Sequence, residues 1–210
     1  MRNIDLLKYR VIIIDGDIDD SLATEVINNI LSLFDKNPKE KIYVLIDSNG
    51  GQITSAMAIY DVINYLSCEI ITIALKNSSA IATLLLATGS RGKRYAFKNS
   101  EIRMGFNLYS NEDGVNNILE ENFNRIGLVI SKVIDCYAKA TGLDKEKLTV
   151  LCNVNNILSI ENIIKSNLVD EIIASHIDSK SKSRVNFITK IKDRNYYEKV
   201  IRELENAGIM

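Results

Sequence analysis

Two adjacent serines stand where a strand-like apolar run gives way to a helix-like one, a position that many hydrolases use for a nucleophile. Ser78 and Ser79 lie in the stretch KNSSAIATLLLATG, residues 76–89, shortly after Lys76. A serine hydroxyl beside a lysine amine that has lost its proton can attack a carbonyl carbon. Serine is also a preferred residue at the N-terminal cap of a helix. The stretch therefore allows a catalytic interpretation and a structural one.

We favour the structural interpretation, because the sequence supplies few catalytic partners. The only histidine, His176, follows the last strand-like segment, far from both serines along the chain. Lys76 stands at the end of an apolar run, where a lysine is usually a solvated surface charge. We therefore expect Ser78 and Ser79 to cap the helix that follows them.

A pair of glycines marks a second place where the backbone itself can matter. Gly50 and Gly51 follow the apolar run that ends near Asp47, and glycine permits positive φ and a close approach of the backbone to another group. We expect a tight turn there, with Asp47 as a turn former. Asp19 and Asp20 are expected to serve as turn formers and caps rather than as a catalytic carboxylate pair.

The composition excludes several classes of function. The chain has 210 residues, and 26 Lys and Arg stand against 27 Asp and Glu, which gives a formal net charge of -1. No overall field therefore attracts nucleic acid or an anionic membrane, and the apolar runs are too short to span a bilayer. Cys68, Cys136 and Cys152 form neither a disulfide framework nor a zinc motif, and we expect them to be reduced. No pattern predicts a metal or an organic cofactor.

Short apolar runs alternate with segments of helical period, which is the pattern of buried parallel strands joined by crossover helices. The strands that we expect first are residues 9–15, 41–48 and 69–75. The helices between and after them are expected at residues 19–37, 53–67 and 79–89. Asp20 or Ser21 is the expected N-cap of the first helix. The pattern indicates an α/β fold.

The second half of the chain adds longer and more polar segments. After short strands in residues 93–106, apolar residues at spacings of three and four predict a long amphipathic helix from 113 to about 140, ended by Gly142. A helix with Ser159 as N-cap and then a strand are expected in residues 158–174. The polar stretch SKSKSR separates them from a final helix expected at 195–208.

The order of these elements, and several strings within them, resemble the proteolytic subunits of the Clp protease, the ClpP family, over about residues 5–175. The strings are LLKYRVIIIDGDIDDSLATEVINNILSL, IYVLIDSNGGQITSAMAIYDVI, LLLATGSRGKRYAFKNSEI, YAKATG and LSIENIIKSNLVDEII. The resemblance implies a head domain within residues 1–176, built as a crotonase-like spiral of βαβ units, from which a handle helix at about 113–142 protrudes. Residues 177–210 would form a polar linker and a helical extension.

ClpP subunits are serine proteases, but the residues at the matching triad positions of this chain are different. The register of the nucleophile motif places Ala80 at the serine position, in KNSSAIA. The register of the histidine motif, RMGFN, places Gly105 at the general base, and NNILS places Asn155 at the acid. A methyl group cannot attack a carbonyl, and no general base or orienting carboxylate remains at these positions.

One part of the family's machinery is retained in the sequence. By resemblance, the backbone N–H groups of the Gly50–Gly51 turn and of Ile81 would form an oxyanion hole. Such a donor pocket can bind a carbonyl oxygen but cannot form an acyl-enzyme without a nucleophile. A serine displaced by one residue does not replace Ala80 simply, because one step along a helix rotates the side chain by about 100°.

The resemblance is greatest to ClpR subunits, the inactive paralogues of plastids and cyanobacteria. It implies a non-catalytic subunit that forms or joins heptameric rings, with an active ClpP paralogue and a Hsp100-type AAA+ unfoldase as partners. Asn153 and Val154 replace the charged pair that links stacked rings in active members, so we expect weaker stacking. A plastid-type organelle, apicoplast or chloroplast stroma, is the expected compartment, and a bacterial cytoplasm is the alternative.

Two other functions stay open at this point. The first is a residual serine hydrolase that uses Ser78 or Ser79 with Lys76 as its base. The second is a crotonase-like enzyme that uses the oxyanion hole for a CoA thioester. The handle helix and the C-terminal strings weigh against the second alternative.

Overall fold

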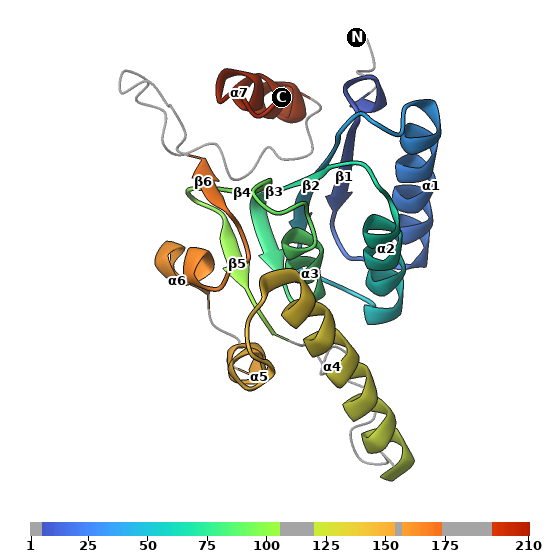
Figure 1. Cartoon of the computed structure of the whole chain (residues 1–210), viewed down its shortest axis with the longest axis vertical. Coiled ribbons are helices and arrows are strands. Elements are labelled where there is room, and N and C mark those ends of the chain that lie inside the picture. The colour runs from blue at the N-terminus through green and yellow to red at the C-terminus, as the bar shows by residue number, and fades with distance from the viewer. Residues whose placement is uncertain (1–5, 106–119, 154–156, 174–194) are drawn as a thin grey trace.

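The body of the protein is a sheet with helices on both faces (Figure 1). The computed structural model describes residues 6–105, 120–153, 157–173 and 195–210. The strands are β1 Val11–Asp15, β2 Ile42–Ser48, β3 Ile70–Ser79, β4 Arg94–Phe97, β5 Glu101–Arg103 and β6 Glu171–Ile173. The helices are the 3-10 turn η1 Leu6–Tyr9, then α1 Asp20–Lys36, α2 Ile53–Tyr65, α3 Ile81–Ala87, α4 Glu120–Thr141, α5 Lys145–Asn153, α6 Ile160–Lys165 and α7 Asn195–Asn206.

The sheet confirms the predicted α/β class, since its neighbouring strands pair in parallel through helical crossovers. The strand order is β1-β2-β3-β4-β6, and β5 also pairs with β3. β3 has two partners on one side because it is long: Thr72 to Ala74 pair with β4, while Asn77 to Ser79 pair with β5. The end of β3 thus lies between the Gly50–Gly51 turn after β2 and the end of β5.

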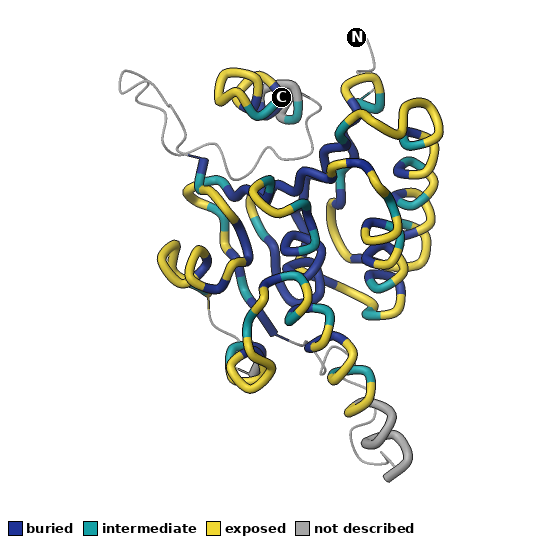
Figure 2. The backbone as a smooth tube through the Cα atoms, viewed as in Figure 1, coloured by how far each residue is buried: buried dark blue, intermediate teal, exposed yellow. Residues whose placement is uncertain are grey.

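The sheet separates two apolar layers, because alternate side chains of each strand point to opposite faces. Val44 and Ile46 belong to the larger cluster, which includes the buried residues of α1, α2 and α3. Tyr43 and Leu45 belong to a smaller cluster, which includes buried residues of α7. Both faces of the central strands are therefore buried (Figure 2).

The predicted long helix is present as α4. Its C-terminal half packs on the larger cluster through Val133, Ile134 and Tyr137, while Leu128, nearer the other end, is 66% exposed. Figure 1 shows α4 running outward from the body. Gly142 follows its last residue with φ +75, as the C-terminal glycine signal predicted. Residues 113–119 of the prediction lie outside the described residues.

Local capping agrees with the sequence in one helix and differs in another. Ser159 caps α6, and its hydroxyl oxygen accepts the Asn162 N–H at 3.3 Å, as predicted. The N-cap of α1 is Asp19, whose carboxylate accepts the Leu22 N–H at 2.8 Å. The expected capping role of the pair Asp19 and Asp20 is thus confirmed for Asp19, whereas the N-cap expected at Asp20 or Ser21 was wrong by one or two residues. The aspartate one residue earlier wins because it has the extended backbone of an N-cap.

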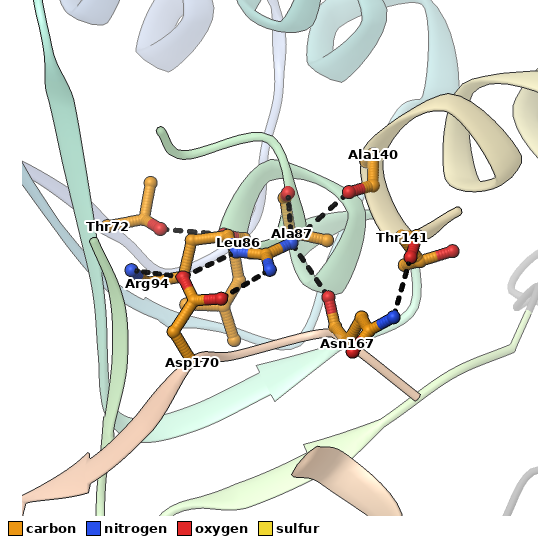
Figure 3. A network of polar contacts seen from close by, with 8 residues as sticks. All are labelled: Thr72, Leu86, Ala87, Arg94, Ala140, Thr141, Asn167 and Asp170. Carbon is orange, nitrogen blue, oxygen red and sulfur yellow. Dashed lines mark hydrogen bonds and ion pairs between the residues drawn. The ribbon is translucent and has the colours of Figure 1, made fainter. Parts of the chain in front are cut away.

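A buried ion pair joins the ends of several elements (Figure 3). Arg94 at the start of β4 makes two side-chain hydrogen bonds to Asp170, of 2.9 and 2.6 Å. Its remaining nitrogen donates to the carbonyl oxygens of Ala87, Ala140 and Asn167. These carbonyls belong to the last turn of α3, the last turn of α4 and the turn that follows α6. A single guanidinium therefore holds the ends of three helices against the sheet. We call this set the Arg94 network.

Candidate functional site

The residue at the predicted nucleophile position occupies a sharp turn between a strand and a helix. β3 ends at Ser79, α3 begins at Ile81, and Ala80 between them has φ 51 and ψ -127. Positive φ is costly for any residue with a Cβ and is seen where the surroundings enforce it. Serine hydrolases use a strained strand-to-helix turn of this kind to display a nucleophile. Here the turn displays a methyl group, on a residue that is 9% exposed.

Hydroxyl groups on two helices hold this turn in place. The Tyr137 hydroxyl of α4, fully buried, donates to the Ala80 carbonyl at 3.0 Å. The Thr83 hydroxyl of α3 lies 2.7 Å from the Ser78 carbonyl and 2.8 Å from the Arg103 carbonyl. Sequence reasoning missed both contacts, because Tyr137 fitted the apolar stripe of its helix. A hydroxyl within such a stripe is the signal that was available, since a buried one needs an acceptor.

The prediction that Ser78 and Ser79 cap α3 was wrong. Both are the last residues of β3, and the N-cap of α3 is Ala80, without a side-chain cap. The strand runs beyond the predicted end at residue 75 because its last residues pair with β5. The Ser79 hydroxyl donates to the Asn77 side-chain oxygen at 2.8 Å. The Ser78 hydroxyl is buried and has no partner among the described residues.

The glycine turn lies directly against Ala80 and Ile81. Gly50 has φ +104, and a Cβ built on it would lie 3.0 Å from the Ala80 Cβ and 3.5 Å from the Ile81 nitrogen. Gly51 has φ +146, and a Cβ there would lie 2.3 Å from the Ile18 carbonyl oxygen. Both positions therefore need glycine, for the backbone conformation and for space. The sequence-predicted turn is present, and it brings Gly50 next to the turn at Ala80.

Two of the predicted oxyanion donors differ in whether their N–H group already has an acceptor. The Gly50 N–H already donates to the Ser48 hydroxyl oxygen at 3.1 Å, and that hydroxyl donates to the Gly16 carbonyl at 2.6 Å. The Ile81 N–H, as the first of α3, has no acceptor within its own helix. The arrangement can present Ile81 to an oxygen atom, while Gly50 would first have to leave Ser48.

The other two triad positions are less fully described. Gly105 is buried and follows β5, whose Arg103 pairs with Ser79 on one side and with Ile157 on the other. A glycine at this position brings no side chain toward the turn at Ala80. Asn155, Val154 and His176 lie outside the described residues, and Asn153 is the last residue of α5.

The two charged residues discussed near the site, Lys76 and Asp47, have surroundings that fit a structural role rather than a catalytic one. Lys76 is exposed, as predicted, whereas Asp47 lies in β2 rather than in a turn. Burial raises the pKa of Asp47 above its ordinary value, against the opposing effects of the Lys76 charge and of the Asn77 N–H, which donates to its carboxylate at 3.1 Å. Asp15, its neighbour in β1, adds to the rise of this pKa. The Asp47 carboxylate therefore joins β2 to the end of β3 at the place where the pairing of the two strands shifts register.

Neither the cysteines nor a metal-binding cluster provides a reactive centre in the part of the chain that the structure describes. Cys68, Cys136 and Cys152 are free, and burial raises the pKa of Cys152 to about 12. Within the described ranges, no three His, Cys, Asp or Glu side chains come together as a metal site. No helix among the described residues combines the length and the apolar character needed to cross a membrane.

A comparison with protein families gives this geometry a context. The family model described as Clp protease matches residues 3–176. The matched range contains all strands of the sheet, the glycine turn, the strained turn at Ala80 and helix α4, and it leaves out α7. A match of this extent covers well over half of the sequence, and the chain therefore belongs to the Clp protease family.

Proposed function

We propose that this chain is a proteolytically inactive, ClpR-type subunit of a Clp protease complex. The observation that carries the proposal is the alanine at the strained turn: Ala80 has the backbone conformation that displays a nucleophile and no group that can act as one. The glycine at position 105 and the asparagine at position 155 support the same conclusion, because neither can take up a proton as a general base or carry a negative charge.

The neighbouring serines give little support to a relocated active site. Ser78 has no exposed surface, so a substrate cannot reach its hydroxyl without opening the sheet. Ser79 donates its hydroxyl proton to Asn77, an amide oxygen that cannot activate it as a base. Lys76 is exposed, and a lysine needs desolvation or a neighbouring cation to act as a neutral base.

The subunit's contribution to such a complex would be structural and regulatory. Clp protease family members form oligomeric rings that work with AAA+ partners, and this chain has the family's fold. By this proposal it forms or joins a heptameric ring, beside an active ClpP paralogue and below a Hsp100-type unfoldase. A plastid-type organelle is the compartment that we propose, with a bacterial cytoplasm as the alternative. Affinity capture of the endogenous protein, followed by identification of the captured subunits, tests the partners.

A fluorophosphonate probe tests the lack of catalysis directly. We expect the full chain to remain unlabelled under conditions that label an active serine protease of the family, and to leave a fluorogenic peptide uncleaved. The matched variants are Ser78→Ala and Ser79→Ala, which remove the two serine hydroxyls that directly precede the turn. Robust labelling of the natural chain that either variant abolishes would establish a relocated nucleophile and overturn the proposal.

A second variant tests whether catalysis is absent only because the nucleophile position holds an alanine. Ala80→Ser restores a hydroxyl at the turn but neither a base nor an acid, so we expect it to stay unlabelled as well. Labelling of Ala80→Ser would mean that another group of the chain activates the hydroxyl. That result would leave the natural chain inactive but would contradict the loss of all three triad functions.

A further inference from the structure

Asn49 and Gly50 form the one Asn–Gly pair in the sequence. In such a pair the backbone nitrogen of the glycine can attack the side-chain amide of the asparagine, because no Cβ on the glycine hinders the approach. The pair lies in the turn between β2 and α2, directly beside Ala80. Asn49 is exposed, whereas Gly50 is buried. Water can therefore reach the Asn49 amide, and the surroundings of Gly50 decide whether the reaction starts.

The reaction replaces the side-chain nitrogen of Asn49 by oxygen, and it consumes only water. The Gly50 nitrogen gives its proton to a base in the solvent and forms a bond to the side-chain carbonyl carbon of Asn49. The bond between that carbon and the amide nitrogen breaks, and the nitrogen leaves as ammonia with the proton that the base returns. Water then opens the succinimide ring at either of its carbonyl carbons, which yields aspartate or isoaspartate.

The fold holds the attacking nitrogen of Gly50 away from this reaction. The Gly50 N–H donates to the Ser48 hydroxyl oxygen at 3.1 Å, and the Ser48 hydroxyl donates to the Gly16 carbonyl at 2.6 Å. The Gly50 carbonyl oxygen accepts the Ile18 N–H at 2.7 Å. Gly50 is thus fixed through both of its peptide groups to the segment that follows β1. Its nitrogen can turn toward Asn49 only after the bond to Ser48 opens.

The side chain of Asn49 is held by a different strand. The Asn77 side-chain amide, in β3, donates to the Asn49 side-chain oxygen. The Ser79 hydroxyl donates to the oxygen of the same Asn77 amide at 2.8 Å, so the NH2 group of Asn77 is the part left to face Asn49. The two groups that must meet are therefore bound to different neighbours, the Asn49 amide to β3 and the Gly50 N–H to Ser48.

We propose that Asn49 is a deamidation site, and that the hydrogen bond from Gly50 to Ser48 sets the rate at which it reacts. Opening of this bond frees the Gly50 nitrogen while the sheet stays folded. The same opening is needed before Gly50 can donate to an oxygen atom beside Ala80. Isoaspartate formation adds a carbon to the main chain at position 49 and so shifts Gly50 relative to Ala80. The inference does not depend on the proposed loss of catalysis.

The test follows deamidation of the full chain by peptide mapping and mass spectrometry during incubation near neutral pH. Fragmentation of the peptide locates the mass shift that exchange of nitrogen for oxygen gives at Asn49. We expect the folded natural chain to react slowly and Ser48→Ala to react at least about fivefold faster, a factor of the size that one hydrogen bond contributes. Asn49→Gln should show no shift at this position, because glutamine would have to close a larger ring.

The matched control is Ser100→Ala. The Ser100 hydroxyl also donates to backbone carbonyls, those of Ala74 and Leu75 at 3.0 and 2.6 Å, and these partners lie in β3 rather than in the glycine turn. Ser100→Ala should therefore react at the rate of the natural chain. An unchanged rate in Ser48→Ala, or an equal increase in both variants, would overturn the proposal.

A second measurement uses only the natural chain and serves if Ser48→Ala folds poorly. Its deamidation rate is measured at low urea concentrations, at which the protein stays folded. Opening of a single turn exposes little surface, so the rate should hardly change with urea. A rate that rises in proportion to the unfolded population would overturn the proposal. The same holds if the folded chain reacts as fast as the chain in denaturing urea, or if it does not react at all.

Discussion

Ala80 has the strained backbone conformation that displays a nucleophile in serine hydrolases, although its own side chain is only a methyl group. A non-glycine residue in a sparsely populated region costs about 1 to 3 kcal/mol, and Ala80 has φ 51 and ψ -127. The cost is met locally, since Tyr137 holds the Ala80 carbonyl and Thr83 holds the Ser78 carbonyl. The turn is thus a feature of the frame, which persists because neighbouring hydroxyls and packing enforce it.

The strain at Ala80 predicts an unusual response to glycine. In Ala80→Gly, relief of strain offsets the lost methyl group and the greater freedom of the unfolded chain, so we expect the free energy of unfolding to change by less than about 1 kcal/mol. The control is Ala82→Gly, two residues on in α3 and fully buried, where we expect a loss of about 2 kcal/mol from helix propensity and burial. Urea denaturation measures both. Equal losses in the two variants would show that Ala80 is not strained.

At Gly51 we expect a substitution to be strongly destabilising. The Cβ of an alanine there would clash with the backbone of Ile18, which cannot move aside as a flexible side chain can. A Cβ would lie 2.3 Å from the Ile18 carbonyl oxygen and 2.5 Å from the Ile18 nitrogen, at φ +146. We expect Gly51→Ala to lower the free energy of unfolding by about 3 kcal/mol or more. Gly92→Ala is the control, with φ +78 but no atom within 4 Å, and should cost about 1 kcal/mol. A similar cost at both positions contradicts the close approach of Gly51 to Ile18.

At the scale of the elements, the Arg94 network fixes where the helices end. Arg94 and Asp170 have side chains that are 5% and 24% exposed. Burial by itself would raise the pKa of Asp170, but the hydrogen bonds and the charge of Arg94 outweigh it and hold this pKa below its ordinary value. The pair joins β4 to the residue just before β6, and the same guanidinium reaches the last turns of α3 and α4.

Removal of the carboxylate should therefore be costly and dependent on pH. Asp170→Asn leaves the buried Arg94 without a counter-charge, and we expect a loss of about 3 to 5 kcal/mol near neutral pH. A lowered pKa in the folded state means that the contribution of Asp170 is complete above its ordinary pKa of 3.8 and fades as pH falls through the folded value. Denaturation curves at several pH values should thus show the natural chain and the variant converging in acid.

The control for this prediction is an ion pair on the surface. Glu161 and Lys165 form an i,i+4 pair on α6 with side chains 73% and 67% exposed. Solvent screens such pairs, so Glu161→Gln should change the free energy of unfolding by no more than about 0.5 kcal/mol. If Asp170→Asn were as mild as Glu161→Gln, the Arg94 network would not hold the helix ends as we describe.

Sequence patterns predicted the elements that local signals define. The strand expected at residues 41–48 is β2 Ile42–Ser48, because a short continuous apolar run between polar residues is typical of a buried parallel strand. β3 was predicted too short, since its last residues pair with β5, a contact between distant segments that no local pattern contains. The short, largely polar helix α5 Lys145–Asn153 was not predicted at all.

The candidate site was predicted in position and missed in detail. The register of KNSSAIA placed Ala80 at the strand-to-helix turn, where the structure also has it. The roles of Tyr137 and Ser48 were not predictable, because both depend on which carbonyl or N–H the fold brings within hydrogen-bond distance. The docking of α7 was missed for the same reason: a helical pattern shows an apolar stripe, but not the surface that it covers.

At the scale of the whole molecule, several apolar side chains are exposed on helices α4, α5 and α6 and just before α6. Leu128 on α4, Val150 on α5, and Ile157 and Ile160 around the start of α6 are exposed. α4 runs outward from the body of the protein (Figure 1). Such surfaces are expected of a subunit that buries them against other subunits.

The order of charges before position 155 should decide whether rings of this chain stack. By the resemblance to ClpP subunits, Asn153 and Val154 would stand where active members carry the acidic and basic residues that link rings. If the proposed function holds, we expect native mass spectrometry to show single heptamers of the natural chain. Asn153→Glu with Val154→Arg restores the pair and should give double rings. The reversed pair, Asn153→Arg with Val154→Glu, adds the same charges in the wrong order and should stay single. Double rings formed by the natural chain, or equally by both variants, would show that stacking depends on other contacts, such as the exposed apolar residues of α4.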